Sequence, residues 1–425
     1  MMLPMTWRRW LVVGLVFLAL AFGGVYWRAS HVWQAMLATV DAKQKELQES
    51  SNERPVLWGD ATPGNAFDHY EAAIKLIATE SAILTVEDGC SDVREMIERW
   101  VQSVANKSAQ RDKLLSDTQP AFALLRTGAH CRNGRRAIAW EDGFDSVTPD
   151  VIEMLEVGVV AALQARSLMD RGEGLEAARV ILDVMQFGRD LYDDPCFLVS
   201  LVGGAVMFLP CKNLMLQSLD SNEVRRKGRP ASILESLDSE ALAVLAVGLE
   251  KLDRDPWSLG RALTAETVLL VRQIEQPAGF TGAFGGTALP LAWQLGFSSR
   301  YLVGDAVDRL MHTAETLPAI DGEWLAASKS LDAIALEHQG SVNPLMMMLV
   351  PQLRSVERGR RESLANLRMV RMAVAAVRGE SADFADPFGG SLRSTTVKGR
   401  PRYWSAGEDG KDDGGDPNKD LVRVR

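Results

Sequence analysis

The chain has 425 residues, 47% of them hydrophobic, and its 47 basic and 56 acidic side chains give a formal net charge of −9. This acidic balance disfavours nucleic acid as the main partner, because proteins that bind a phosphate backbone usually carry a basic excess. Four cysteines are too few for a disulfide scaffold, and 35 glycines with 17 prolines are too few for a disordered chain.

An uncharged apolar run covers residues 10–27, directly after Arg8 and Arg9. As a helix, its 18 residues would rise about 27 Å, close to the thickness of a bilayer core. Aromatic residues flank both ends, as they do at membrane interfaces: Trp7, Trp10, Tyr26 and Trp27. Because the basic residues precede the run, the N-terminus is predicted to be cytoplasmic and the remainder extracytoplasmic. Residues 1–28 are therefore predicted to form a cytoplasmic stub and a single-pass transmembrane anchor.

A cleaved signal peptide is the alternative interpretation, because Ala19, Leu20 and Ala21 match a cleavage site. The apolar run continues past Ala21, which favours the uncleaved anchor, and either interpretation exports the body. Residues 197–209 are also apolar but too short to span a bilayer, so we expect a buried helix there. Residues 276–299 are uncharged but contain five glycines and two prolines, and we expect a buried or interfacial loop.

After the anchor, apolar residues recur at intervals of three and four, the period of a helix that buries one face. Residues 29–64 are predicted to form a stalk helix and a linker, and residues 65–340 a helical body. Within the body, Ser232 and Glu235 match a capping box, which predicts a helix ending near residue 251. No stretch before residue 380 alternates with the period of a strand. The predicted fold class is mainly α, with an irregular multi-helix body.

The most amphipathic segment is residues 352–378, in an Arg-rich helix region predicted at 341–379. Its apolar stripe is Leu364, Leu367, Val370, Val374 and Val377. Its seven arginines are Arg354, Arg358, Arg360, Arg361, Arg368, Arg371 and Arg378, set against Glu357 and Glu362. The pattern favours a core helix with a solvated arginine face. Docking on anionic lipid headgroups or on an acidic partner are the functional alternatives.

Outside the cytoplasm, thiols tend to pair. Cys196 and Cys211 lie at the two ends of a predicted helix, about 22 Å apart, which is beyond disulfide reach. Cys90 and Cys131 lie in loop-like contexts, and we predict a disulfide between them.

The sequence contains none of the common hydrolase, zinc-protease or nucleotide-binding motifs. Spacings of three and four place Asp305, Asp308, His312 and Glu315 on one helical face, which we interpret as a solvated polar face. No catalytic residue and no organic cofactor is predicted.

Residues 380–425 change in character. Two short strands are predicted at 392–397 and 400–405, followed by an acidic glycine-rich loop. Four carboxylates lie within eight residues of this loop: Asp409, Asp412, Asp413 and Asp416. Hard oxygen ligands on a flexible backbone suit calcium, and even a weak site would fill at millimolar calcium outside the cytoplasm. The loop is therefore a predicted calcium site, the alternative being a mobile acidic tail.

Several residues of this segment carry a resemblance to a known family. They are Asp386, Pro387, Phe388, Gly389, Tyr403, Ser405, Gly407, Asp409 and Gly410. In this pattern the segment resembles the C-terminal end of the major pseudopilin of type II secretion, and the resemblance implies a small β-sheet with a calcium loop. The complete layout is similar to bacterial membrane-anchored helical proteins with a pilin-like ending. That likeness implies the inner membrane and a periplasmic body, and it assigns no activity.

Two functional hypotheses follow from the sequence. The first is a membrane-anchored extracytoplasmic interaction or scaffold protein with a protein partner. The second is an extracytoplasmic hydrolase whose carboxylates are assembled from distant helices, and it predicts clustered carboxyl groups with raised pKa values in a cleft.

Overall fold

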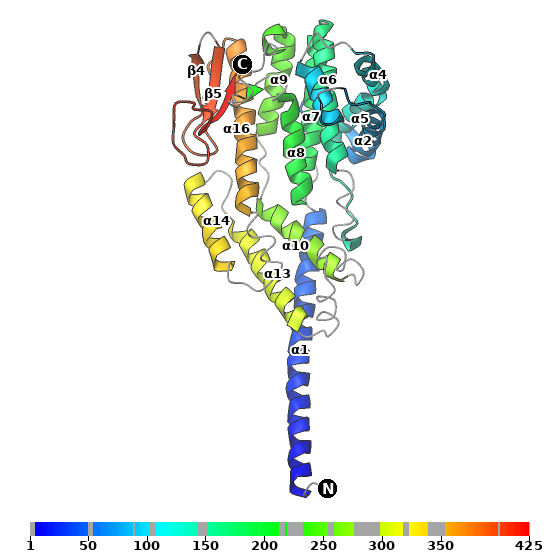
Figure 1. The fold of residues 1–425 in the computed structure, drawn as a ribbon, viewed down its shortest axis with the longest axis vertical. Coiled ribbons are helices and arrows are strands. Elements are labelled where there is room, and N and C mark those ends of the chain that lie inside the picture. The colour runs from blue at the N-terminus through cyan, green and yellow to red at the C-terminus, as the bar shows by residue number, and fades with distance from the viewer. Residues whose placement is uncertain are drawn as a thin grey trace.

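The computed structural model of the chain gives the fold drawn in Figure 1. It describes residues 5–49, 54–87, 90–102, 108–142, 151–194, 196–211, 217–218, 233–253, 259–275, 298–317, 323–338, 353–397 and 400–424. Within the first helix, side chains are described from residue 27 onward.

Most of the described chain is helical. The helices are α1 (Met5–Glu49), α2 (Phe67–Ala82), α3 (Val93–Gln102), α4 (Ala109–Asp117), α5 (Gln119–His130), α6 (Val151–Asp170), α7 (Gly174–Tyr192), α8 (Phe197–Pro210), α9 (Ser239–Asp253), α10 (Leu259–Glu275), α13 (Ser298–Thr316), α14 (Trp324–His338) and α16 (Leu353–Val377). The strands are β1 (Thr62–Asn65), β2 (Cys131–Asn133), β3 (Gln217–Ser218), β4 (Arg393–Val397), β5 (Arg400–Ser405) and β6 (Leu421–Val424). The prediction of a mainly α protein is confirmed.

The centre of the body is formed by α6, α7 and α8, which pack against one another. On one side α2 and α5 cover α6 and α7, and on the other α9 and α16 complete the upper body (Figure 1). The helix expected at 197–209 is confirmed as α8, and most of its side chains are buried, while Leu198 and Leu201 remain exposed. Glycines let α7 and α8 approach closely, because a Cβ at Gly203 would lie only 2.6 Å from the carbonyl oxygen of Gly188.

Residues 29–49 of the predicted stalk are helical and belong to one continuous helix with the preceding residues. Helix α1 enters the lower body, where its upper part packs against α13 and α10 (Figure 1). Its buried residues there are Trp33, Met36, Val40 and Leu47, at the three-and-four spacing of one helical face. The body is therefore built directly onto the upper part of α1.

The N-terminal apolar run falls almost entirely outside the described side chains. Among the described residues, no helix combines the length and the apolar character needed to cross a membrane. Trp27, at the end of the run, is 70% exposed. Residues 276–297 of the second uncharged stretch also lie outside the described part.

A small antiparallel sheet near the C-terminus confirms the predicted β appendage. The strand order is β3-β6-β5-β4, with Ser394 opposite Tyr403 in the β4–β5 pair. The two predicted strands are present, and the sequence pattern did not predict β6 or the two-residue β3 that pairs with it. The sheet lies beside α16, with Tyr403 and Trp404 buried.

Two local predictions are wrong. Residues Ile233–Ser236 form a 3₁₀ turn, and α9 begins at Ser239, where the carboxylate of Asp238 accepts a hydrogen bond from the Ala241 amide (2.8 Å). Asp238 is therefore the cap of this helix. On α16, the arginine face is not simply solvated, because Arg360 and Arg361 are buried beside Glu357.

Candidate functional site

Helix α7 carries four buried polar residues: Asp183, Gln186, Arg189 and Asp190. Of these, Asp183, Gln186 and Asp190 follow one another at spacings of three and four. Its remaining faces are rich in apolar residues that pack into the core. Helices α5, α6, α8 and α9 all contact α7, so almost no side of it is left for solvent. These polar groups must therefore find partners inside the protein.

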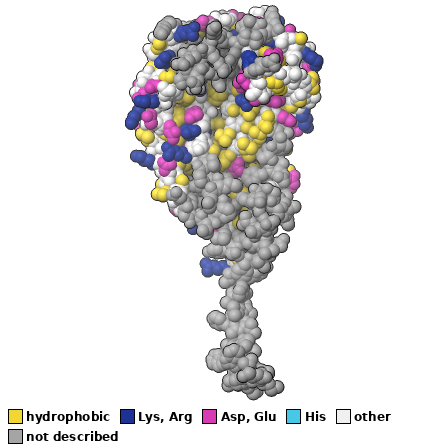
Figure 2. Space-filling model, in the orientation of Figure 1, with side chains coloured by type: hydrophobic (Ala, Val, Ile, Leu, Met, Phe, Trp, Pro, Cys, Tyr) yellow, Lys and Arg dark blue, Asp and Glu magenta, His cyan; other side chains and the backbone are white. Residues whose placement is uncertain are grey.

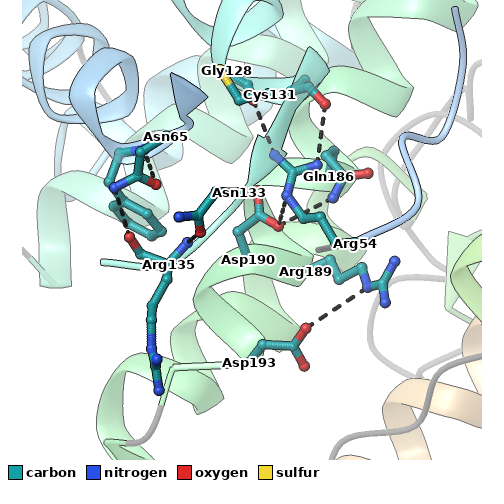
Figure 3. Close-up of polar contacts among 12 residues, drawn as sticks. Arg54, Asn65, Gly128, Cys131, Asn133, Arg135, Gln186, Arg189, Asp190 and Asp193 are labelled. Carbon is teal, nitrogen blue, oxygen red and sulfur yellow. Dashed lines mark hydrogen bonds and ion pairs between the residues drawn. The ribbon is translucent and has the colours of Figure 1, made fainter. Parts of the chain in front are cut away.

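Asp190 is the centre of the first cluster. One of its carboxylate oxygens lies 2.8 Å from Arg54 Nε and accepts a hydrogen bond from Gln186 (3.1 Å). The other oxygen accepts a hydrogen bond from the Tyr70 hydroxyl (2.9 Å). Arg54 also donates to the carbonyl oxygens of Gly128 and Ala129. In Figure 3 the guanidinium lies between Asp190 and the backbone that leads into Cys131.

This arrangement ties the segment after α1 to the middle of the body. Arg54 connects that segment to both α5 and α7. Close to it, Asn65 donates to the carbonyl oxygen of Arg135 (2.9 Å), and β1 runs parallel to β2 (Figure 3). A Cβ at Gly134 would meet the Asp190 carboxylate at 2.5 Å, so this position needs glycine.

Asp183 forms a second cluster, two helical turns before Asp190. Its carboxylate accepts hydrogen bonds from Trp58 Nε1 (2.7 Å) and Arg126 Nε (3.0 Å). The guanidinium groups of Arg126 and Arg179 lie 5.2 and 5.1 Å from the centre of the Trp58 ring, within the range of cation–π attraction. This cluster holds Trp58 against α7.

A third cluster holds the start of α8. The Glu266 carboxylate accepts a hydrogen bond from the Phe197 amide (2.7 Å), and Asp194 accepts one from the Cys196 amide (3.0 Å). Both amides lie at the helix start, where donors have no partner within the helix. Asp194 also pairs with Arg136 (2.9 Å).

Burial changes the acidity of these carboxyl groups. Desolvation raises the pKa of Asp190 to about 7, against the opposing effect of Arg54, and it raises the pKa of Asp183 to about 6. It also raises the pKa of Glu266 to about 7, against the hydrogen bond from Phe197. Raised carboxyl pKa values were the signature expected for a hydrolase. However, these groups are buried and bonded to protein donors, and they face no described cleft.

The raised pKa of Asp190 predicts a pH dependence of stability. The folded chain holds this proton more tightly than the unfolded chain, in which the ordinary value is 3.8. The contribution of Asp190 to the free energy of unfolding therefore decreases as the pH rises from about 4 to about 7. Asparagine does not titrate, so we expect the stability of Asp190→Asn to lack this pH dependence. Urea denaturation of both proteins at several pH values measures the difference. An unchanged difference between the two proteins across that range would contradict the assignment.

The predicted calcium residues lie in the turns between β5 and β6, where several have protein partners. Asp412 accepts a hydrogen bond from Trp404 Nε1 (2.9 Å) and pairs with Arg393 (2.7 Å). Asp413 pairs with Lys419 (2.9 Å). Asp409 and Asp416 accept hydrogen bonds from nearby backbone amides, those of Lys411 and Asn418. In the described part of the chain, no three His, Cys, Asp or Glu side chains are placed to hold a metal ion. Calcium binding in this loop stays a prediction.

The other predicted residues can also be located. All four cysteines are free thiols in the structure, so the Cys90–Cys131 disulfide stays a prediction. The four polar residues of α13 are exposed, as expected, and Asp305 pairs with Arg309 (2.9 Å) on the same helix.

Comparison of the chain with known protein families, with curated proteins and with solved structures gives no match. The polar clusters of α7 and α8 were not predicted from the sequence. One signal was present: α7 has apolar residues on every face, as expected of a buried helix, but this signal does not identify the partners of its carboxylates.

Proposed function

We propose that the protein is an extracytoplasmic scaffold, held at a bacterial inner membrane by the N-terminal part of α1, whose helical body binds a partner protein. The observation that carries this proposal is the continuity of α1. The helix runs without a break from Met5 to Glu49, so the predicted anchor and the core of the lower body belong to one rigid element. A body joined in this way is held in one orientation relative to its anchor.

The polar clusters on α7 support the same role. They fasten Arg54 and Trp58, which follow α1 in the chain, to the middle of the body. The segment after the stalk is thereby fixed to the upper helices at two points. Together with the packing of α1 against α10 and α13, this favours a rigid support over a freely swinging domain.

The C-terminal sheet is proposed to be a pilin-like appendage. The pairing of β4 with β5 and the burial of Asp386 support this proposal. Asp386 accepts hydrogen bonds from the Ser405 hydroxyl (2.8 Å) and the Ala406 amide (2.9 Å), so residues of the resemblance pattern bind one another.

Fractionation of bacteria that express the full chain tests the anchoring. We expect the chain to remain in the membrane fraction after carbonate extraction, and protease added to spheroplasts to digest the body. The variant Leu15→Arg with Leu18→Arg places two charges in the apolar run and should release the chain or prevent its export. A soluble cytoplasmic chain would contradict the proposal, and a mature N-terminus at Phe22 would establish the signal-peptide alternative.

Chemical cross-linking in intact membranes tests the scaffold role. We expect a reproducible partner protein to be captured through the body. Failure to capture any specific partner would contradict this part of the proposal without affecting the anchoring.

A further inference from the structure

Helix α8 exposes an apolar stripe on the side of the body. Leu198 and Leu201 are 45% and 44% exposed, Ala205 is exposed and Phe208 is half-buried. Their spacings of three, four and three place all four on one helical face. Figure 2 shows hydrophobic side chains gathered over the middle of the body, in the region where Figure 1 draws α8.

The stripe continues into a groove of about 260 Å³ between α8 and α16. Small residues on both helices, among them Gly204 and Gly359, line the groove. Asn366 also lines it.

Charged side chains border the apolar centre. Arg358 and Glu362 on α16 are 48% and 45% exposed and lie 3.4 Å apart. An apolar centre with a charged rim is the usual composition of a protein–protein interface. The presence of both signs at this rim allows the face to complement itself.

We propose that this face of α8 and α16 pairs with the same face of a second copy of the chain. Helix α8 lies nearly along the long axis of the molecule, as does α1 (Figure 1). Two copies anchored with the same topology in one membrane can be related by a two-fold axis parallel to the long axis of the molecule. Such an axis brings the two α8 stripes together side by side, and each copy contributes the same residues.

The direction of this axis rests on the proposed anchoring, but the exposed apolar stripe does not. Confinement in one membrane also raises the effective concentration of the two copies, so that an interface of modest size is sufficient. Burial of Leu198 and Leu201 in the contact would remove their apolar surface from water.

Cysteine cross-linking of the full chain in membranes tests the proposal. A symmetric contact places each stripe residue near its own counterpart, so we expect Leu201→Cys to form a disulfide-linked dimer under mild oxidation. The matched control is Leu336→Cys on α14, since Leu336 is also an exposed leucine but lies outside the stripe. The unsubstituted chain controls for the four native cysteines. Cross-linking of Leu201→Cys no stronger than that of Leu336→Cys would overturn the proposal, as would exclusive cross-linking to a different protein.

The mass of the detergent-solubilised chain gives an independent measurement. We expect twice the 46.6 kDa chain mass for the unsubstituted protein and a shift to the single mass for Leu201→Arg, with no shift for Leu336→Arg. Membrane flotation is measured on the same membranes before detergent is added. A chain that floats but is monomeric would overturn the dimer alone, whereas a dimer that does not float would overturn the anchoring alone.

Discussion

Above pH 7, where the Asp190 carboxyl is ionised, its replacement by alanine is expected to lower the free energy of unfolding by about 3–5 kcal/mol, the range for breaking a buried ion pair. The side chain of Arg54 is only 6% exposed, and the substitution removes the carboxylate that faces it. Tyr70 and Gln186 lose their acceptor at the same time. The guanidinium is also bound to the carbonyl oxygens of Gly128 and Ala129, so in the variant it would stay buried without a carboxylate partner.

Urea denaturation of the solubilised chain measures this effect. Glu173→Ala is the matched control, since Glu173 lies just before the same helix and forms an exposed pair with Arg171 (2.6 Å), in which the side chains are 48% and 51% exposed. We expect the control to change stability by no more than about 0.5 kcal/mol. Hydrogen exchange should also show faster exchange in residues 54–65 for Asp190→Ala only. Equal effects of the two substitutions would show that the buried pair does not stabilise the fold.

A double substitution separates the free-energy cost of leaving one buried charge unpaired from the contribution of the ion pair itself. Arg54→Met combined with Asp190→Ala removes both charges and keeps an unbranched side chain at position 54. We expect the double variant to lose less stability than the sum of the two single variants, because neither leaves a buried charge alone. Strict additivity would contradict the direct pairing of Arg54 with Asp190.

The sequence predicted helices well where apolar periodicity and a terminating residue agree. The segment predicted at 352–378 is α16, Leu353–Val377, and the one predicted at 197–209 is α8, Phe197–Pro210. In both cases the local sequence contains the cause, because apolar residues recur along the segment and most of them are buried once the helix forms. The predicted capping box includes Ser232, which lies outside the described residues, while Glu235 lies in a 3₁₀ turn and Asp238 caps α9.

The polar clusters could not be predicted in the same way, because their members are far apart in the chain. Tyr70 and Asp190 are separated by 120 residues, and Trp58 and Asp183 by 125. A local window shows only a carboxylate on a helix, which normally faces water. The arginines of α16 were misjudged for the same reason. Arg368 and Arg371 both pair with Asp253 of α9, more than 100 residues earlier in the chain.

Glu357 provides the second large expected effect. Its carboxylate accepts hydrogen bonds from Arg360 (2.6 and 2.8 Å) and from Arg361 Nε (2.8 Å), and all three side chains are almost fully buried. Arg361 also donates to the carbonyl oxygen of Pro387 in the C-terminal segment. Glu357 thus pairs with the arginine that connects α16 to this segment.

Glu357→Ala is therefore expected to lower the free energy of unfolding by about 3–5 kcal/mol and to loosen the C-terminal sheet. Glu357→Gln keeps the shape and the acceptor oxygen but removes the charge, so its effect should be smaller. The exposed pair of Glu380 with Arg378 (2.8 Å) supplies the control, Glu380→Ala, with an expected change below about 1 kcal/mol.

Limited proteolysis and urea denaturation distinguish the outcomes. For Glu357→Ala we expect early cleavage within residues 386–424, before the helical body is cut, because the Arg361 contact with Pro387 depends on a neutralised guanidinium. Glu380→Ala should keep the cleavage pattern of the unsubstituted chain. If Glu357→Ala unfolded the body and the sheet together, the two would form one cooperative unit, and the carboxylate would stabilise the chain as a whole. If it changed neither stability nor cleavage, the buried network would not be the connection between α16 and the sheet.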